Sequence, residues 1–591
     1  MRYCPRNSMN CTIGAKDPVA AEADLFKISL AFPRDMLYNH LVNFYNFSEE
    51  RIQLMKLSIK GLENRALWEA AGVKLPGYDI AAARAEANKA PTWVHFGAGN
   101  LFRAFPANLQ QGLLEQGAVK GGVFVAETFD YEIVDAAYAP FDNLSLLVNL
   151  MPDGATEKTL VGSVAGAFRA DNAYPADYAR LKEIFRSPSL QMISFTITEK
   201  GYALTDMRGE FTRLAQADFA AGPDGCISAM GKVASLLLER YNAGATPLAV
   251  VSMDNCSHNG EKLRAGVVTM AQQWKDRGFV PQGYMDWLTD EAKVSFPWSM
   301  IDKITPRPAP SVVEELKKAG IEGMEVIVTG KKTYTAGFVN TEKPQYLVIE
   351  DRFPNGRPPL EKAGVYMTDR DTVNNTERMK VTTCLNPLHT ALAVYGCLLG
   401  YTSIAGEMQD KELKALVEKI GYQEGMPVVV DPGILNPSDF IHEVIDRRFP
   451  NPYMPDTPQR IATDTSQKIP VRFGQTISAY VSAQGLDVTG LVYIPLAIAG
   501  WLRYLLAVDD QGAPMACSPD PMLETLQGQL AGVRLGAPDS VSGKLEAILS
   551  NTVIFGSDLM ALGLGDRIIG MVKELLAGPG AVRATLKKYL D

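Results

Sequence analysis

Short apolar segments that alternate with helix-like segments constrain the fold of this chain more than any other feature. Runs typical of buried strands begin at Trp93, Gly122, Gln191 and Leu248, and a helix-like stretch from Phe105 to Gly117 follows the first. Such alternation is typical of a parallel sheet with helices on both faces. We therefore expect an α/β domain with a doubly wound, Rossmann-like sheet.

The length of 591 residues exceeds what one hydrophobic core supports, so the chain is expected to divide into domains. Residues 1–90 carry no chemical motif and read as a helical N-terminal extension. Residues 91–376 hold the strand–helix alternation, and helical patterns dominate residues 377–591. The prediction is a Rossmann-like N-terminal domain, a mostly helical C-terminal domain and a helical extension.

Composition and cysteine usage exclude several classes of function. With 47% hydrophobic and 21% charged residues and a net charge of −9, the chain lacks the basic character that nucleic-acid binding requires. Seven scattered cysteines without a Cys-x-x-Cys pair favour reduced thiols and a cytoplasmic location. The most apolar window, Leu491 to Val508, is interrupted by Pro495 and Arg503 and predicts a core helix. We expect neither a nucleic-acid nor a membrane partner, and the sequence does not indicate the oligomeric state.

A glycine loop stands directly after the first predicted strand. Glycines at the start of a following helix let backbone N–H groups approach a pyrophosphate. Phe102 replaces the third glycine of the usual dinucleotide pattern, so a plain tight turn is the alternative interpretation. The residues expected to contact a dinucleotide are Gly97, Ala98, Gly99, Asn100, Leu101, Phe102 and Glu127.

Glu127 supports the nucleotide interpretation. It ends the second predicted strand, where an acid can accept hydrogen bonds from the adenosine ribose. A carboxylate there repels a 2′-phosphate, which favours NAD over NADP as the cofactor. Asp130 competes for this role, and a solvated strand-end carboxylate is the structural alternative.

The segment from Lys380 to His389 carries the strongest chemical signal. Asn386 is a natural N-cap and Pro387 a natural first helical residue, with Lys380 on the incoming strand or loop. A lysine and a histidine buried together need a reason, because desolvating charge is costly. Carbonyl–alcohol chemistry without a metal would supply that reason.

Several other segments stand in a defined order along the chain. They are Thr196-Ile-Thr-Glu-Lys-Gly-Tyr, Ser252-Met-Asp-Asn-Cys-Ser-His-Asn-Gly, Phe296-Pro-Trp-Ser-Met-Ile-Asp-Lys-Ile-Thr-Pro-Arg-Pro, Glu377-Arg-Met-Lys through His389, and Arg460-Ile-Ala-Thr-Asp-Thr-Ser-Gln-Lys. In this order they resemble the polyol-specific long-chain dehydrogenases, which include mannitol 2-dehydrogenase and the hexuronate reductases. The resemblance runs from about Thr92 to the C-terminus and looks closer to the hexuronate reductases such as fructuronate reductase.

The resemblance implies a metal-independent, NAD-dependent oxidoreductase. It makes Lys380 the general base in oxidation and the general acid in reduction. Asn255 and Asn386 would stabilise the developing oxyanion, and His389 would hold the substrate. The supporting carboxylates and polar substrate contacts would be Asp302, Glu377, Arg460 and Lys468. Elementary chemistry agrees with these roles, since an alkoxide that forms without zinc needs donors aimed at it and burial can lower a lysine pKa.

The spacing within the central motif departs from the family. Six positions separate Lys380 from Asn386, whereas comparable sequences have the two one residue closer, followed by Gly or Ala instead of Pro387. The extra residue either bulges ahead of the helix or displaces the base.

Each candidate residue also has a structural interpretation. Asn255 could cap the turn before a helix near Lys262, and Asp302 could pair with Lys303 or Arg307. Solvation or ordinary packing would explain the remaining polar candidates, which are Lys380, His389, Arg460 and Lys468.

Other dehydrogenase classes fit the sequence less well. The five histidines form no cluster of the kind that zinc enzymes need, so no metal is expected. Tyr178 and Lys182 match the spacing of short-chain dehydrogenases, but the glycine loop does not. The leading hypothesis is reduction of D-fructuronate to D-mannonate with NADH. The alternatives are tagaturonate and altronate, mannitol and fructose, or a non-catalytic nucleotide-binding homologue.

Overall fold

The computed structural model describes residues 55–206 and 208–591, and its central element is a six-stranded sheet. The strands are β3 (Trp93–Phe96), β4 (Val123–Glu127), β7 (Val164–Arg169), β8 (Met192–Phe195), β9 (Leu248–Ser252) and β10 (Val294–Ser295). All neighbours pair in parallel, in the order β10-β9-β8-β3-β4-β7. This is the Rossmann strand order, so the predicted doubly wound sheet is confirmed.

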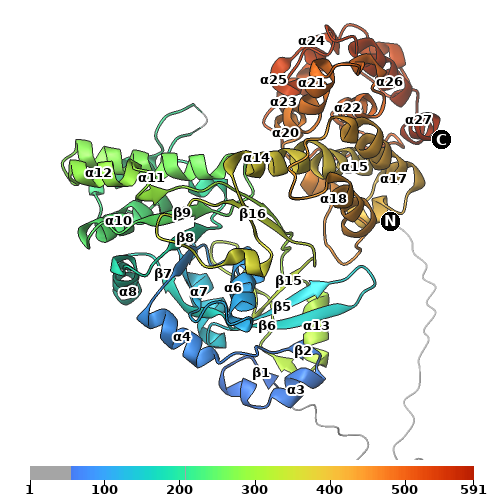
Figure 1. Cartoon of the computed structure of the whole chain (residues 1–591). Coiled ribbons are helices and arrows are strands. Elements are labelled where there is room, and N and C mark those ends of the chain that lie inside the picture. The colour runs from blue at the N-terminus through green and yellow to red at the C-terminus, as the bar shows by residue number, and fades with distance from the viewer. Residues whose placement is uncertain (1–54, 207) are drawn as a thin grey trace, which may run out of the picture. The chain divides into compact units, whose positions relative to one another are not determined.

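Helices cover both faces of this sheet because successive strand residues point to opposite sides. Val94 and Phe96 pack against α8 (Pro175–Arg186), α10 (Ala229–Asn242), α11 (Asn259–Asp276) and α12 (Gln282–Thr289). Trp93 packs on the other side, with α5 (Asn100–Ala104) and α6 (Pro106–Glu115). Figure 1 shows α10, α11 and α12 gathered beside β8 and β9.

Smaller sheets complete the first part of the described chain. A four-stranded sheet has the order β15 (Phe338–Thr341), β5 (Ser145–Leu150), β6 (Thr156–Val161), β2 (Val73–Lys74). A three-stranded sheet has the order β11 (Ser299–Asp302), β16 (Tyr346–Glu350), β17 (Tyr366–Thr368). The pairs are β13 (Ile327–Val328) with β14 (Tyr334–Thr335), and β1 (Met55–Lys56) with β12 (Ile321–Glu322).

The predicted N-terminal extension is only partly helical where it is described. It contains α3 (Arg65–Ala70) and α4 (Ile80–Lys89), but β1 and β2 add edge strands to two sheets. Leu57 and Trp68 are fully buried in the core beneath them. Residues 55–90 therefore pack into the first domain, because their apolar side chains are needed to close its edge. Residues 1–54 lie outside the described residues.

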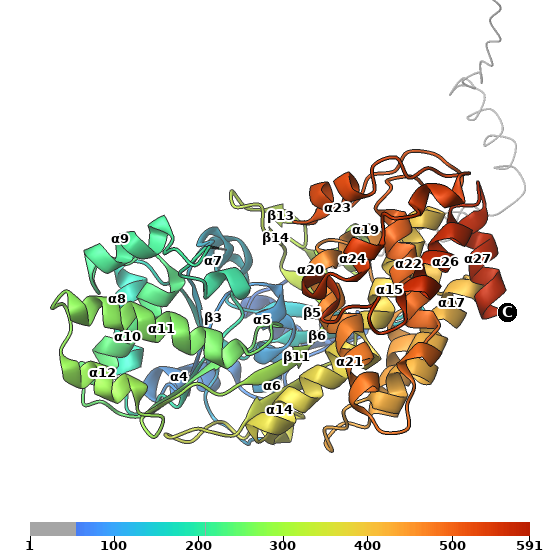
Figure 2. The same cartoon turned by 90° about the horizontal axis from the view of Figure 1, so that it is seen from above.

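From residue 370 onward the named elements are all helices. They include α14 (Arg370–Arg378), the π-helix η5 (Met379–Cys384), α15 (Asn386–Leu399), α16 (Ile404–Glu407), α17 (Lys411–Glu418), α18 (Pro437–Glu443), the π-helix η8 (Val444–Arg448), α19 (Pro458–Ile461), α20 (Thr465–Ile469), the π-helix η9 (Pro470–Gly474), α21 (Gln475–Ser482), α22 (Tyr493–Tyr504), α26 (Gly565–Leu575) and α27 (Ala581–Leu590). Figure 2 shows α15, α22 and α26 grouped together, and they share one large core. The helical C-terminal region is as predicted.

The apolar window around Pro495 forms the buried helix α22, as expected. Every residue from Ile494 to Tyr504 is buried in the C-terminal core. Among the residues that the structure describes, none of the helices combines the length and the hydropathy that a bilayer crossing requires.

An unpartnered carboxyl group lies inside this core. Glu407 is fully buried, and neither carboxyl oxygen has a hydrogen-bond partner. Gly396 provides its space, since a Cβ there would come within 1.7 Å of Glu407 Oε1. Burial, together with Asp456 and Asp410, raises the pKa of Glu407 to about 9. The folded protein therefore holds Glu407 protonated at neutral pH.

We expect Glu407→Gln to stabilise the protein more as the pH rises. The unfolded chain releases this proton above about pH 4.5 while the folded chain keeps it to about pH 9. Stability should fall across that window by up to about 1.4 kcal/mol per pH unit through this group alone. Thermal unfolding of the variant and of the parent from pH 5 to 9 should diverge steadily. A difference in stability that stays constant across that range would contradict this ionisation.

Candidate active site

The strand order of the parallel sheet reverses between β3 and β8, and open α/β sheets bind ligands outside the carboxyl ends of the strands at such a point. The glycine loop follows β3, and residues 196–198 follow β8. Gly97 has φ +103°, and a Cβ on it would lie 2.3 Å from the Thr196 carbonyl oxygen. Gly99 has no atom within 4 Å of its Cβ position and directly precedes α5. The fold thus requires glycine at position 97, whereas Gly99 leaves the loop open toward a ligand.

Glu127 fastens this loop to the end of β4. Its Oε2 accepts the Ala98 N–H at 2.8 Å, and its Oε1 accepts the N–H groups of Thr128, Phe129 and Asp130 at 2.9, 2.9 and 3.2 Å. Each carboxylate oxygen has two lone pairs, and Oε2 accepts only one backbone N–H, so Oε2 keeps one lone pair for a ribose hydroxyl. The predicted ribose contact therefore stays possible beside a structural role that the sequence did not reveal.

Asp130, the competing acid, faces a different element. Its Oδ2 accepts the hydroxyl of Thr329, in the hairpin of β13 and β14, at 2.7 Å, and it is 3% exposed. Glu127 is thus the acid that lies against the glycine loop.

Phe102, which stands where a third glycine was expected, packs on a buried imidazole. Its ring stacks on His95 with centroids 4.5 Å apart. His95 bonds Ser194 Oγ and Thr196 Oγ1 at 2.7 and 2.8 Å, and burial lowers its pKa to about 3. The neutral His95 therefore ties β3 to β8 beneath the loop, and Phe102 covers it.

Asn100 and Arg103 hold the loop helix against the hairpin. The Arg103 guanidinium, 1% exposed, donates to Asn100 Oδ1, Thr335 Oγ1 and the Ala336 carbonyl at 2.7–2.8 Å. The side chain of Asn100 is thus occupied within the protein. Its Nδ2 also donates to the Tyr334 carbonyl at 3.3 Å, and the contact of Asn100 with the cofactor stays a prediction.

Lys380 lies at the junction of the two parts of the chain. It is 1% exposed, and its Nζ donates to Asn255 Oδ1 at 2.9 Å and to the Ile301 carbonyl at 3.0 Å. Burial lowers the pKa of Lys380, while the carboxylates of Asp302 and Glu377 oppose that effect. A lysine with a lowered pKa is suited to exchange a proton with a substrate hydroxyl.

The position of Lys380 differs from the prediction. It lies in the π-helix η5, which continues α14, and not on a strand or loop. A π turn contains one more residue than an α turn, and such turns occur mostly at functional sites. Lys380 and Asn386 therefore belong to two successive helices, η5 and α15.

Asn255 binds the lysine and does not cap a helix. The helix after it, α11, begins at Asn259 with His258 as N-cap and without a side-chain cap bond. The structural alternative for Asn255 is therefore wrong. Because its Oδ1 faces Lys380, its Nδ2 is left to donate elsewhere.

Asn386 is the first residue of α15, and the N-cap position belongs to Leu385. The N-cap prediction was wrong by one residue, because Leu385 (φ −133°) makes the sharp turn out of the π-helix. His389 follows within the first turn, as expected. Its Nε2 lies 3.2 Å from Asp456 Oδ2, a close contact without hydrogen-bond alignment, and burial lowers its pKa.

Asp456 connects two predicted substrate contacts and was missed by sequence reasoning. Besides approaching His389, its Oδ1 accepts bonds from Arg460 Nε and Nη2 at 2.9 and 2.7 Å. The available signal was the four-residue spacing of Asp456 and Arg460.

Lys468 and Arg472 add two further cations to this region. Lys468 Nζ donates to the carbonyls of Ile461, at 3.1 Å, and Thr463, and burial lowers its pKa to about 8 with help from Arg472. Arg472 donates to Thr390 Oγ1 at 2.6 Å, and burial lowers its pKa to about 10. Arg472 was not predicted, although it follows Lys468 at helical spacing.

The two predicted carboxylates have separate partners. Asp302 is 5% exposed and bonded to Arg448, so the suggested pairing with Lys303 or Arg307 is replaced by a more distant arginine. Glu377 accepts the hydroxyl of Ser257. Both carboxylates favour the protonated form of Lys380 and so raise its pKa against the effect of burial.

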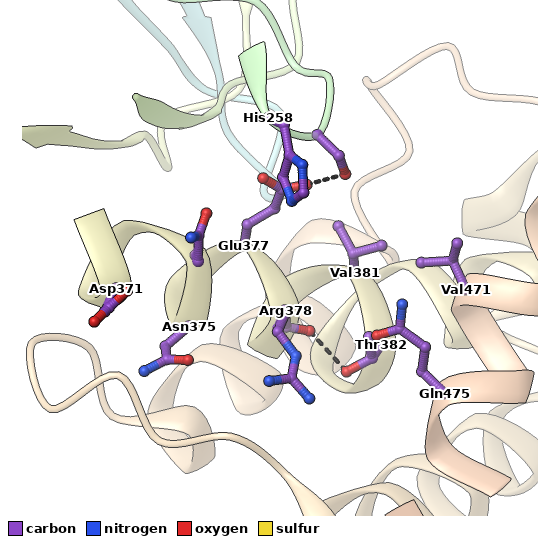
Figure 3. Close-up of a pocket in the computed structure, with 11 residues that line it drawn as sticks. His258, Asp371, Asn375, Glu377, Arg378, Val381, Thr382, Val471 and Gln475 are labelled. Carbon is purple, nitrogen blue, oxygen red and sulfur yellow. Dashed lines mark hydrogen bonds between the residues drawn. The ribbon is translucent and has the colours of Figure 1, made fainter. Parts of the chain in front are cut away.

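A pocket of about 730 Å³ opens beside α14 and η5. Glu377 and Val381, on either side of Lys380 in the helix, line it together with Gln475. Figure 3 shows Glu377 and His258 reaching toward each other from α14 and from the loop after β9. Within residues 55–206 and 208–591, no three His, Cys, Asp or Glu side chains are placed to share a metal ion.

Comparison with known proteins identifies the family. The mannitol dehydrogenase Rossmann domain matches residues 91–362, and the mannitol dehydrogenase C-terminal domain matches residues 372–575. The chain belongs to the mannitol dehydrogenase family. It is 52% identical to a D-mannonate oxidoreductase of Thermotoga maritima over 91% of this chain and 99% of that one. It is 30% identical to a polyol:NADP oxidoreductase of Gluconobacter oxydans over 78% of this chain and 88% of that one.

Solved structures agree with this family assignment. The mannitol 2-dehydrogenase of Pseudomonas fluorescens, in a ternary complex with NAD and D-mannitol, superposes with a TM-score of 0.66 at 27% identity. The match covers 90% of this chain and 99% of that one. The Rossmann domain, the helical domain and the family resemblance expected from the sequence are all confirmed.

The two glycines of the loop should respond differently to substitution. Gly97→Ala should lower Tm by roughly 5 °C or more, because its Cβ would clash with the Thr196 carbonyl and its φ is positive. Gly99→Ala should leave Tm unchanged but weaken NADH binding, because only a ligand approaches that side. Thermal unfolding and NADH fluorescence titration separate the two effects. Equal loss of Tm in both variants would refute this division of roles.

Proposed function

We propose that the chain interconverts a ketohexuronate and a hexonate, with D-fructuronate and D-mannonate as the pair. As a member of its family, the chain is an NAD-dependent dehydrogenase that acts on a CH–OH group. The observation that carries the substrate proposal is the 52% identity to a D-mannonate oxidoreductase along almost the whole of both chains. The cysteine pattern supports a cytoplasmic location for this activity.

The cofactor site proposed for NAD lies at the carboxyl end of β3. Gly97 and Gly99 shape the loop, the open side of Gly99 leaves room for a pyrophosphate, and Oε2 of Glu127 keeps a free acceptor position. When bound there, NAD supplies the group that accepts or donates a hydride.

The residues around Lys380 account for the proton transfer. In oxidation, the neutral amine of Lys380 accepts the hydroxyl proton of the substrate; in reduction, its ammonium returns a proton to the carbonyl oxygen. Burial lowers the pKa of Lys380, which makes its neutral amine easier to form than that of a solvated lysine. Asn255 fixes the amine through Oδ1, and the amides of Asn255 and Asn386 can donate to the developing oxyanion.

The cations of the C-terminal domain suit an acidic substrate. Arg460 is 62% exposed, and two of its nitrogens bond Asp456, which leaves the Nη1 group to meet a carboxylate. Lys468 and Arg472 lie nearby on the following helices. His389, in close contact with Asp456, is placed to bind substrate hydroxyl groups.

One observation favours a second candidate, a mannitol and fructose oxidoreductase. Arg460 is already neutralised by Asp456, so its attraction for a substrate carboxylate is reduced. Tagaturonate and altronate are a further alternative among the ketohexuronate and hexonate pairs.

The assay that tests the proposed function is NADH oxidation by chelator-treated protein with D-fructuronate, D-tagaturonate or D-fructose. Selective turnover of D-fructuronate supports the proposal, turnover of another substrate reassigns it, and inactivity with all three despite NADH binding would overturn it.

Lys380→Met should reduce kcat by roughly 100- to 10,000-fold in both directions, as expected for loss of a general acid–base group. NADH affinity should stay within about twofold, because Lys380 lies outside the glycine loop. Steady-state kinetics and fluorescence titration measure the two quantities. Lys362→Met removes an exposed lysine and is the matched control. If Lys380→Met keeps most of its kcat, Lys380 is not the proton-transfer residue.

Arg460→Ala should raise KM for the ketouronate more than for D-fructose. A carboxylate loses a charge-assisted bond when the guanidinium is removed, worth about 1.5–3 kcal/mol and thus roughly 10- to 100-fold. D-Fructose lacks the carboxylate and should lose much less. The ratio of kcat/KM for the two substrates is the measurement. An equal loss for both substrates would show that Arg460 does not recognise the carboxylate.

A further inference from the structure

A buried charge cluster joins the C-terminal helices to the Rossmann domain beside Lys380. Arg448, the last residue of η8, is 2% exposed in its side chain. Its Nη1 and Nη2 donate to Asp302 at 2.6 and 3.1 Å, and its Nε and Nη2 donate to Glu342 at 3.0 and 2.8 Å. One guanidinium thus binds two carboxylates, both from the Rossmann side.

The cluster is adjacent to the catalytic amine through the backbone. Asp302 ends β11, and its neighbour Ile301 gives its carbonyl oxygen to Lys380 Nζ at 3.0 Å. Of the charged groups around Lys380, Asp302 raises the pKa of the amine most. Lys380 in turn lowers the pKa of Asp302. The same carboxylate therefore faces two cations, Arg448 and Lys380.

We propose that Arg448 is a positioning residue that holds Asp302 in its own ion pair, so that Lys380 stays bonded to Asn255 as an exchangeable amine. This inference rests on the proposed role of Lys380 in proton transfer. Without Arg448, Asp302 would turn to Lys380 as the remaining nearby cation. The lysine would then be held as an ammonium in a salt bridge and lose its function as a base.

Several charged groups set the protonation of Lys380. Asp302 from β11 and Glu377 from α14 favour the ammonium, while burial and Arg448 from η8 oppose it. Glu342 follows β15 and pairs with Arg448. Lys303 donates to the Glu342 carbonyl at 2.6 Å, and burial lowers its pKa to about 8. Arg448 thus acts on Lys380 twice, directly as a cation and indirectly by neutralising Asp302.

The geometry explains why the position requires arginine. A guanidinium offers five N–H donors in a rigid fork, and here that fork meets two carboxylates at once. Removing one member of a buried ion cluster leaves an uncompensated charge, which is strongly destabilising. A lysine at position 448 would keep the charge but could not make all four bonds.

The test is the pH dependence of substrate oxidation in Arg448→Met. In the pH profile of kcat/KM, the rising limb that reflects deprotonation of Lys380 should move to higher pH by roughly one unit. At a pH below this limb, the shift corresponds to about a tenfold loss of kcat/KM. NADH affinity should stay unchanged. Arg448→Lys keeps the cation but cannot make all four bonds, so its limb should move in the same direction by a smaller amount. Arg447→Met, at the exposed neighbouring position, is the matched control and should leave the profile as it is.

A second readout does not depend on turnover. The Tm difference between the protein and Lys380→Met, followed from pH 6 to 10, reports the ionisation of Lys380. Because burial lowers the pKa of Lys380, the stabilisation gained by Lys380→Met should shrink as the pH rises through that pKa. With Arg448→Met in both proteins, this decrease should begin at higher pH.

The two readouts separate failure of this inference from failure of the proposed function. An inactive parent protein that shows the expected Tm shift would overturn the function and leave the role of Arg448 supported. An active parent whose Arg448→Met variant loses kcat equally at every pH would overturn the role of Arg448. If Arg448→Met fails to fold, the pH profile of Arg448→Lys is compared with that of Arg447→Met. A loss of kcat in Arg448→Lys without any shift of its pH limb would then contradict the proposed role of Arg448.

Discussion

The burial of one lysine amine is the constraint on which the site depends. Lys380 loses almost all contact with water, so its ammonium form is costly unless protein groups replace the solvent. Asn255 and the Ile301 carbonyl replace two water partners, and both come from the Rossmann side of the junction. The lysine itself comes from the helical side. The hydrogen bonds of this amine therefore form only when the two parts of the chain are packed together.

Charge compensation at this junction follows from the same constraint. Asp302 raises the pKa of Lys380, yet its ion pair, at 2.6 Å, is with Arg448. If Lys380 transfers protons as proposed, this pairing leaves the amine outside a salt bridge. In the proposed cofactor site, Glu127 has a structural and a binding role. It accepts four backbone N–H groups around the glycine loop, and its Oε2 still keeps an acceptor position for a ligand.

Local sequence patterns predicted the main elements and several residues at the junction, but not the long-range pairs. The strand–glycine–helix alternation gave the Rossmann sheet, and the Lys–Asn–His segment gave the residues around the junction. Arg448 and Arg472 were missed because their partners lie far away in sequence, and an arginine alone has no periodicity. Asp456 was missed although Arg460 stands four residues after it, because its contact with the distant His389 cannot be read from local spacing. The short strands β1 and β2 were missed because two-residue strands form only where a sheet edge is available.

Two successive helices, and not one, position the amine of Lys380 and the amide of Asn386. On one continuous α-helix, a residue added between two side chains would rotate the second by about 100° relative to the first. Lys380 instead lies in the π-helix η5, and Asn386 begins α15 after Leu385, whose φ of −133° interrupts the helical path. The direction of Asn386 therefore follows from this interruption and from the packing of α15, and the number of residues between the two side chains does not by itself turn one of them away.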